Sequence, residues 1–185
     1  MGAVHEEIDD RLAGFLAAQP VFFVGTAPAG HDGHVNVSPK GLAGSFAVLG
    51  PREVAYLDLT GSGAETIAHL RENGRVCLMF CAFTGPPRII RLHGTGVVVM
   101  PGDDDFDDLA GRFTTRPGVR SVIRVAVARI ADSCGYAVPR MDLVAERTQL
   151  ERWAARKGPD GLAAYRRTRN ARSIDGLPAL DPPSG

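Results

Sequence analysis

The chain has 185 residues and a mass of 19.6 kDa, a size typical of one domain with a small appendage. Its 21 basic side chains balance its 21 acidic ones, so no net charge draws it to nucleic acid or to an anionic membrane. A hydrophobic fraction of 44% excludes a disordered chain. The longest apolar runs are far shorter than the roughly 20 residues that span a membrane, and the acidic N-terminal ten residues lack a signal-peptide pattern.

The cysteines and histidines predict neither a disulfide framework nor a metal site. Cys77 and Cys81 are four apart in a predicted strand, which separates them by about 13 Å and prevents a bond between them. The five histidines lack a metal-binding spacing such as H-x-x-x-H. The acidic run 103–108 lacks the spacing of a calcium loop. We therefore expect a protein of the reducing cytoplasm without a bound metal ion.

The first half of the chain predicts a short helix and two hairpins. Residues 8–18 carry apolar side chains close to helical spacing. The β-rich segments 21–26 and 34–38 flank a loop dense in glycine and proline, which is typical of a hairpin. Segments 46–49 and 54–59 flank a Gly-Pro turn and predict the second hairpin.

A helix is predicted between the second hairpin and the strands that follow it. Ser62 and Glu65 fit the S-x-x-E capping box, in which the two side chains satisfy free amide groups of the first turn. The pair Asn73-Gly74 is a favourable helix end, because glycine readily adopts the left-handed conformation found there.

The second half predicts three further strands and a helical end. The β-rich runs 76–83 and 89–100 indicate a long hairpin, and the acidic segment 103–112 a short exposed helix. Residues 121–130 alternate as a last strand, and from Leu143 onward the chain is helical and basic before a proline-rich end. About six strands with one inserted helix favour a mainly β (α+β) fold built on a small antiparallel barrel, since closure removes exposed sheet edges.

Three segments together suggest a grip on a phosphate monoester. Lys40 follows a strand and an extended Ser-Pro pair, and residues 60–63 feed a helix that carries Thr66 in its first turn. Arg88 and Arg91 lie on opposite faces of a strand, so at most one of them faces a given site. Each segment alone has a simpler interpretation as a solvated lysine, a turn with an N-cap, or surface arginines. Their combination of lysine, helix entry and arginine suits phosphate.

The order and spacing of these segments resemble the pyridoxamine 5′-phosphate oxidase-like family of flavin-binding split barrels. The match extends from about Phe15 to about Val138. The segments that carry it are 21–26, 34–41, 54–63, 65–73 and 88–94. The resemblance implies an antiparallel six-stranded split β-barrel over residues 1–140. Residues 141–185 are then a C-terminal helical extension that packs on the barrel or on a dimer partner.

The resemblance also implies a homodimer that holds FMN between its subunits. It assigns the flavin and its ribityl-phosphate arm to Asn36, Ser38, Pro39 and Lys40. It assigns the isoalloxazine edge to Asp58, Leu59 and Thr60, and the phosphate to Ser62, Gly63 and Thr66. Arg88 or Arg91 is expected to reach the site from a neighbouring strand, either of the same subunit or of its partner.

The expected function is that of a flavin-dependent oxidoreductase acting on a small redox substrate of unknown identity. No hydrolase-type nucleophile and base are present, so the cofactor would carry the chemistry and no catalytic side chain is assigned. The basic tail 166–172 contains four arginines but no histidine, unlike the vitamin B6 enzyme of the family, and the strand before Lys40 carries no arginine. Pyridoxamine phosphate is therefore not the expected substrate.

Two alternatives remain open from the sequence. The chain could be a reductase that uses the deazaflavin F420, which related barrels bind. It could instead be a module that binds flavin or haem without turnover, with His93 as the candidate haem ligand. Trp153 on the C-terminal helix is expected to be a packing residue or a cap over a flavin.

Overall fold

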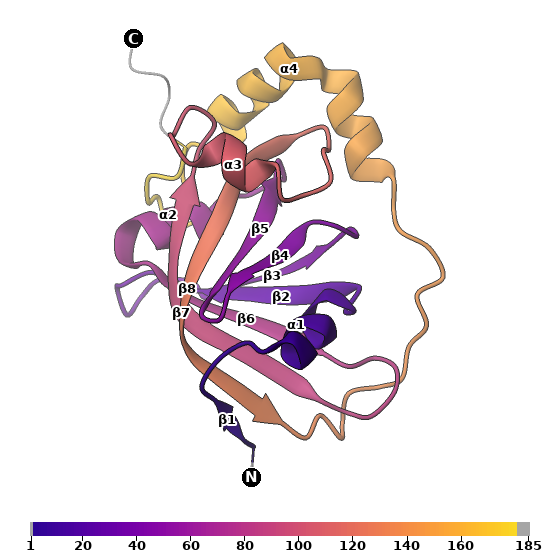
Figure 1. Ribbon diagram of the computed structural model, residues 1–185. Helices are drawn as coiled ribbons and strands as arrows, with labels where there is room; N and C mark the ends of the chain where they lie inside the picture. The colour runs from indigo at the N-terminus through magenta and orange to yellow at the C-terminus, as the bar shows by residue number, and fades with distance from the viewer. Residues whose placement is uncertain (1, 181–185) are drawn as a thin grey trace.

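The computed structural model describes residues 2–180, and the expected proline-rich end at 181–185 lies outside the described residues. The strands are β1 (Val4–His5), β2 (Val21–Thr26), β3 (Asn36–Gly41), β4 (Phe46–Gly50), β5 (Glu53–Leu59), β6 (Arg75–Cys81), β7 (Ile89–Val99) and β8 (Val119–Ser133). The helices are α1 (Asp10–Ala17), α2 (Glu65–Asn73), α3 (Phe106–Ala110) and α4 (Gln149–Arg169). Figure 1 shows one curled sheet with the helices around it.

The sheet is an antiparallel split barrel with the strand order β3-β2-β6-β7-β8-β5-β4. This confirms the expected fold class, but the described sheet has eight strands rather than six. Seven of the eight correspond to the β-rich segments named from the sequence, and the eighth, β1, joins the far end of β8 through Val4 and Ala131. Because β8 is 15 residues long, it pairs with β7 along its length and still accommodates both β5 and β1.

An aromatic cluster fills the interior of the barrel. The rings of Phe22 and Phe80 stack with centroids 5.1 Å apart, and Phe46 and Tyr56 contact Phe22 at 5.4 and 5.5 Å. The alternating burial of β2 explains why Phe22 points inward, since successive side chains of a strand face opposite sides. Tilted and offset aromatic contacts of this kind stabilise a core beyond the area that they bury.

Helix α1 begins two residues later than expected because Asp9 caps it. The Asp9 carboxylate accepts a hydrogen bond of 2.7 Å from the amide of Leu12. Leu12 and Leu16 are buried against the barrel, as their spacing predicts. Ile8, the first residue of the predicted helix, is buried just ahead of the cap.

Helix α2 has the predicted bounds, but the predicted capping box is wrong. The N-cap position is Ala64, and no side chain caps the first turn. Glu65 instead accepts hydrogen bonds of 3.1 and 3.0 Å from the amide of Ile174 in the C-terminal segment. This tertiary contact replaces the local one. At the other end, Gly74 adopts φ 71° and closes the helix as expected.

The C-terminal region is less helical than predicted. Helix α4 begins at Gln149 rather than Leu143, and residues 139–148, here called the arm, contain no helix or strand. Figure 1 shows the arm running along the side of the barrel to α4, which crosses its upper end. Gly158, at φ 63°, and the following Pro159 kink α4. Among the described residues, no helix combines the length and the apolar character that crossing a bilayer requires.

Candidate functional site

A polar cavity of about 400 Å³ opens where β3, the end of β5 and the start of α2 meet. Its lining residues are Asn36, Ser38, Pro39, Lys40, Leu59, Gly61, Ser62, Gly63, Glu65, Thr66 and Arg120. Eight of these are residues that the sequence singled out. Asn36, Ser38 and Lys40 reach the cavity together because alternate residues of β3 share one face.

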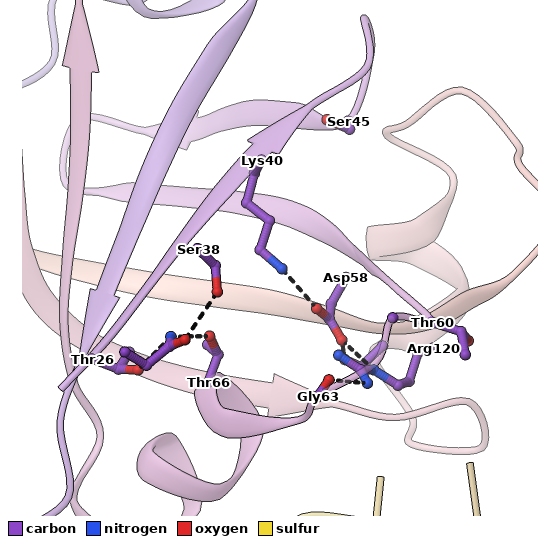
Figure 2. A network of polar contacts seen from close by, with 12 residues as sticks. Thr26, Ser38, Lys40, Ser45, Asp58, Thr60, Gly63, Thr66 and Arg120 are labelled. Atoms are coloured by element: carbon purple, nitrogen blue, oxygen red, sulfur yellow. Dashed lines mark hydrogen bonds and ion pairs between the residues drawn. The ribbon is translucent and has the colours of Figure 1, made fainter. Parts of the chain in front are cut away.

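The described fold therefore brings Lys40 and Thr66 to one cavity, although they lie on different elements (Figure 2). Lys40 projects from the strand and Thr66 from the first turn of α2. The amide groups of that first turn have no capping side chain, so they remain available to a ligand. A helix start with free amides and a nearby ammonium group suits an anion.

A buried carboxylate, Asp58, lies behind the cavity wall. It is fully buried, and its two oxygens bind Lys40 Nζ at 3.2 Å and Arg120 Nε at 2.6 Å (Figure 2). Burial alone would raise the pKa of Asp58, but Arg120 and Lys40 together hold it below its usual value. Asp58 thus stays charged and does not line the cavity. It anchors the two cations that do.

Sequence reasoning did not assign three of the lining residues to the site, namely Gly61, Glu65 and Arg120, and Arg120 is the one that binds Asp58. The β5–β8 register passes from Asp58↔Ser121 to Leu59↔Val119, which leaves Arg120 as the extra residue of a β-bulge. The bulge turns its side chain toward Asp58, and its Nη1 donates to Gly63 O and Asn170 Oδ1, both at 2.9 Å. The available signal was an arginine directly before the predicted last strand, which gave no indication of a bulge.

The loop 60–63 is held from behind by α4. The Thr60 hydroxyl donates to Gly118 O at 2.9 Å and accepts from Arg166 Nε at 2.9 Å. Asn170, just past the end of α4, donates to Gly61 O at 3.1 Å. Thr60 is therefore buried and shapes the loop without lining the cavity.

The opposite wall of the polar cavity is uncharged. Asn36 Nδ2 donates to the hydroxyls of Thr26 and Thr66, each at 3.2 Å, and Asn36 Oδ1 accepts from Ser38 at 3.1 Å. The Thr26 hydroxyl also contacts His69 Nδ1 at 3.0 Å. In Figure 2, Thr26, Ser38 and Thr66 lie to the left of Lys40, Asp58 and Arg120.

An apolar cavity of about 580 Å³ adjoins the polar one. The two share Pro39, Lys40, Leu59 and Gly61 in their linings. The remaining walls of the apolar cavity come from the barrel and from the arm with the first residues of α4. Those lining residues are Pro20, Val21, Gly41, Leu42, Leu57, Leu143, Ala145, Glu146, Arg147 and Leu150. The polar and apolar cavities thus lie side by side, on either side of these four shared residues.

Arg88 and Arg91 are not brought to these cavities within one chain. Arg88 Nε binds Asp132 at 2.8 Å, and its guanidinium lies 5.0 Å from the ring centre of Phe15. Arg91 donates to the Ser133 hydroxyl at 3.0 Å. A role for either arginine in the same subunit's site has no support here, and a role across a dimer remains a prediction.

His93 and Trp153 line neither cavity. His93 lies on β7 opposite Arg129 of β8, and Trp153 packs edge-on against Tyr165 within α4, with ring centres 5.0 Å apart. The three cysteines are free thiols. Within residues 2–180, no group of three or more His, Cys, Asp or Glu side chains could hold a metal ion.

Fold and site together define a split barrel with a polar cavity, lined by Lys40 and Arg120, beside an apolar one. The family model for pyridoxamine 5′-phosphate oxidase matches residues 8–134, and the chain belongs to this family. A pyridoxamine 5′-phosphate oxidase family protein, ustO of Aspergillus flavus, is 42% identical over 97% of this chain and 78% of its own length.

A solved structure gives the same fold at greater distance. The crystal structure of HupZ from Group A Streptococcus superimposes with a TM-score of 0.53 at 19% sequence identity. The superposition covers 73% of this chain and 99% of HupZ. This likeness concerns the fold alone.

Proposed function

We propose that the chain binds FMN and is an FMN-dependent oxidoreductase. The observation that carries the proposal is that the polar and apolar cavities adjoin, with Pro39, Lys40, Leu59 and Gly61 lining both. FMN has the matching chemistry, with a dianionic phosphate at one end and a flat, largely apolar ring system at the other. Membership of the pyridoxamine 5′-phosphate oxidase family supports the same cofactor.

The polar cavity fits the phosphate end. Thr66 contributes a hydroxyl, the first turn of α2 contributes uncapped amides, and Lys40 contributes a positive charge. Lys40 and Arg120 together carry two charges against the single charge of Asp58. Glu65 also lines the cavity, but its carboxylate is bound to the amide of Ile174. Phosphate is well matched to such a combination of amides, hydroxyl and cation.

The apolar cavity fits the ring end. Leu57, Leu59 and Leu150 line it, and the arm adds Leu143 to the lining. Bound FMN would supply transfer of a hydride or an electron pair. The chain itself would orient the ring and exclude water with its leucines.

A homodimer is part of the proposal. Val35 and Val37, beside and within the edge strand β3, are 73% and 64% exposed on the face of the strand opposite to the one that lines the polar cavity. A second copy covering this edge would bury them and could bring its own Arg88 or Arg91 toward the site. Three free thiols support a cytoplasmic location. The physiological donor and acceptor are small molecules that this proposal does not specify.

Titration with FMN tests the proposal, followed by flavin fluorescence and by mass spectrometry of any small molecule released from the native protein. We expect two flavin absorption bands and about 100-fold weaker binding in the variant Lys40→Ala plus Thr66→Ala, since each contact with a charged phosphate contributes roughly tenfold. Lys157→Ala, on α4 beside Trp153, is the matched control. Unchanged FMN retention, a released F420 or a Soret band would each overturn the proposal.

A further inference from the structure

A fully buried imidazole lies at the inner end of the uncharged wall. His69 follows Thr66 by one turn of α2, so both side chains lie on one face of the helix. Its Nδ1 contacts the Thr26 hydroxyl at 3.0 Å. Its Nε2 has no hydrogen-bond partner among the residues that the structure describes.

The imidazole of His69 is neutral at physiological pH. Burial lowers its pKa below the usual value, although Glu65, Asp175 and Glu72 act in the opposite direction. A neutral imidazole carries one N–H and one acceptor nitrogen, so it exists as one of two tautomers. The tautomer depends on whether Nδ1 accepts or donates the hydrogen bond with Thr26.

The hydrogen bonds from His69 to the cavity form a chain in which each hydroxyl has a single proton to give. Thr26 contacts both His69 and Asn36, and Asn36 contacts both Thr66 and Ser38. A hydroxyl that accepts a hydrogen bond from one neighbour donates its own hydrogen to another. The direction of each hydrogen bond in this series therefore depends on the direction of the others.

Two arrangements of the hydrogen atoms give every polar group of this series, except Nε2 of His69, a hydrogen-bond partner. In the first, Nε2 carries the proton, Thr26 donates to Nδ1, and Asn36 Nδ2 donates to Thr26 and Thr66. The Thr66 proton is then left for the cavity. In the second, Nδ1 donates to Thr26, and the amide of Asn36 is reversed. Thr66 then gives its proton to Asn36 and offers the cavity only lone pairs.

We infer that His69 is a positioning residue that, as its Nε2–H tautomer, fixes the Thr66 hydroxyl as a donor toward the bound anion. The orientation of Asn36, with Nδ2 toward both threonines, is that of the first arrangement. The inference rests on the proposed function, because the anion is the phosphate of the proposed cofactor. It adds a residue outside the cavity lining that controls which way one cavity hydroxyl points.

A purely structural role explains His69 poorly. Its Nε2 is buried without a partner, which costs free energy that a leucine at the same position would not cost. Thr26 and Asn36 would still hold each other without it. A histidine at this position has a role if its Nδ1 must accept from Thr26, so that the Thr66 hydroxyl is left to donate into the cavity.

The first test measures the tautomer in the intact chain by ¹⁵N NMR of the imidazole nitrogens, with His69→Asn used to assign the signals. We expect a proton on Nε2 and a bare Nδ1. A proton on Nδ1 overturns the inference. This measurement requires no bound cofactor, so it stands independently of FMN.

The second test measures the affinity for FMN and for inorganic phosphate in variants. We expect His69→Leu to weaken both about tenfold, the contribution of one hydrogen bond to a charged group. His69→Asn, whose carbonyl oxygen can take the place of Nδ1, should stay within about threefold of the unchanged chain. Thr26→Val interrupts the same series of hydrogen bonds while keeping the histidine in place. Its affinities for FMN and phosphate should match those of His69→Leu. Wild-type affinity in Thr26→Val overturns the inference even if His69→Leu does not fold.

A double-mutant cycle separates positioning from general damage. In a Thr66→Val background the donor is already absent, so His69→Leu should cause no further loss, whereas additive losses overturn the inference. Failure of the unmutated chain to bind either FMN or phosphate instead overturns the proposed function. The two failures are therefore distinguishable.

Discussion

Arg166 on α4 donates from Nε to the hydroxyl of Thr60 at 2.9 Å, across 106 positions of the sequence. The same guanidinium donates to Val119 O at 2.8 Å. Asn170, four residues later, holds Gly61 and Arg120. The C-terminal helix is thus part of the frame that fixes the loop in front of α2.

We expect Arg166→Ala to weaken FMN binding about two- to tenfold, because the lost contacts to Thr60 and Val119 leave the loop less ordered. The free energy of unfolding should fall by about 1–3 kcal/mol, since the partly buried Val119 carbonyl loses its charged donor. Flavin fluorescence and urea unfolding measure the two effects. Arg167→Ala, which removes an exposed neighbour, should change neither.

Asp58→Asn should destabilise the protein by about 3 kcal/mol, because it leaves Lys40 and Arg120 without their buried counter-ion. The exposed Asp104→Asn is the control. Equal stability of the two variants in urea unfolding would contradict the account of Asp58 as the anchor of the cation pair.

Asp58 should also shape the acid limb of the stability curve. Its pKa is lowered in the folded chain by Arg120 and Lys40, so its contribution is present above the unfolded pKa near 4. That contribution is lost as the pH falls through the folded pKa. Below about pH 4 the unchanged protein should therefore lose stability more steeply than Asp58→Asn. Parallel curves of stability against pH for the unchanged protein and Asp58→Asn would show that Asp58 does not cause the loss of stability in acid.

His34 and Asp175 should hold the C-terminal segment in a pH-dependent way. Asp175 accepts from His34 Nδ1 at 2.6 Å and from the His34 amide at 2.9 Å. This hydrogen bonding raises the pKa of His34 and lowers that of Asp175. The histidine's contribution is present below its unfolded pKa near 6.5 and lost as the pH rises through the folded value.

The carboxylate's contribution is present above about pH 4 and lost as the pH falls through its lowered pKa, so the contact is strongest between about pH 4 and 6.5. Hydrogen exchange of residues 171–177, corrected for intrinsic rates, should show the best protection in this window. Asp175→Asn should remove this pH dependence of the protection. His31→Ala, in the loop that carries His34, should leave it intact.

Gly94→Ala should destabilise the barrel by about 2 kcal/mol or more, because a Cβ there would lie 2.0 Å from the carbonyl oxygen of Ala126. Gly94 follows the register shift between β7 and β8, where the two backbones approach closely. Gly30→Ala, which meets open space, is the matched control. Thermal unfolding of the two variants decides the matter, and equal melting temperatures would contradict the predicted clash.

Several features were predictable because they depend on residues that are close in sequence. The alternation of β2, the end of α2 at Asn73-Gly74 and the shared face of Asn36, Ser38 and Lys40 all follow from strand and helix geometry. These local patterns favoured a small antiparallel barrel, whereas the split barrel and most of the residues that line the polar cavity were expected from the resemblance to the family.

The tertiary structure decided the rest, because the partners concerned are distant in sequence. Glu65 lost its predicted capping role to Ile174, and Arg120 was turned toward Asp58 by a bulge that depends on strand pairing. Residues 143–148 of the arm, expected to be helical, contain no helix, and four of them line the apolar cavity. Short-range periodicity sets which elements form, whereas burial and charge pairing between remote segments select which side chains meet at the site.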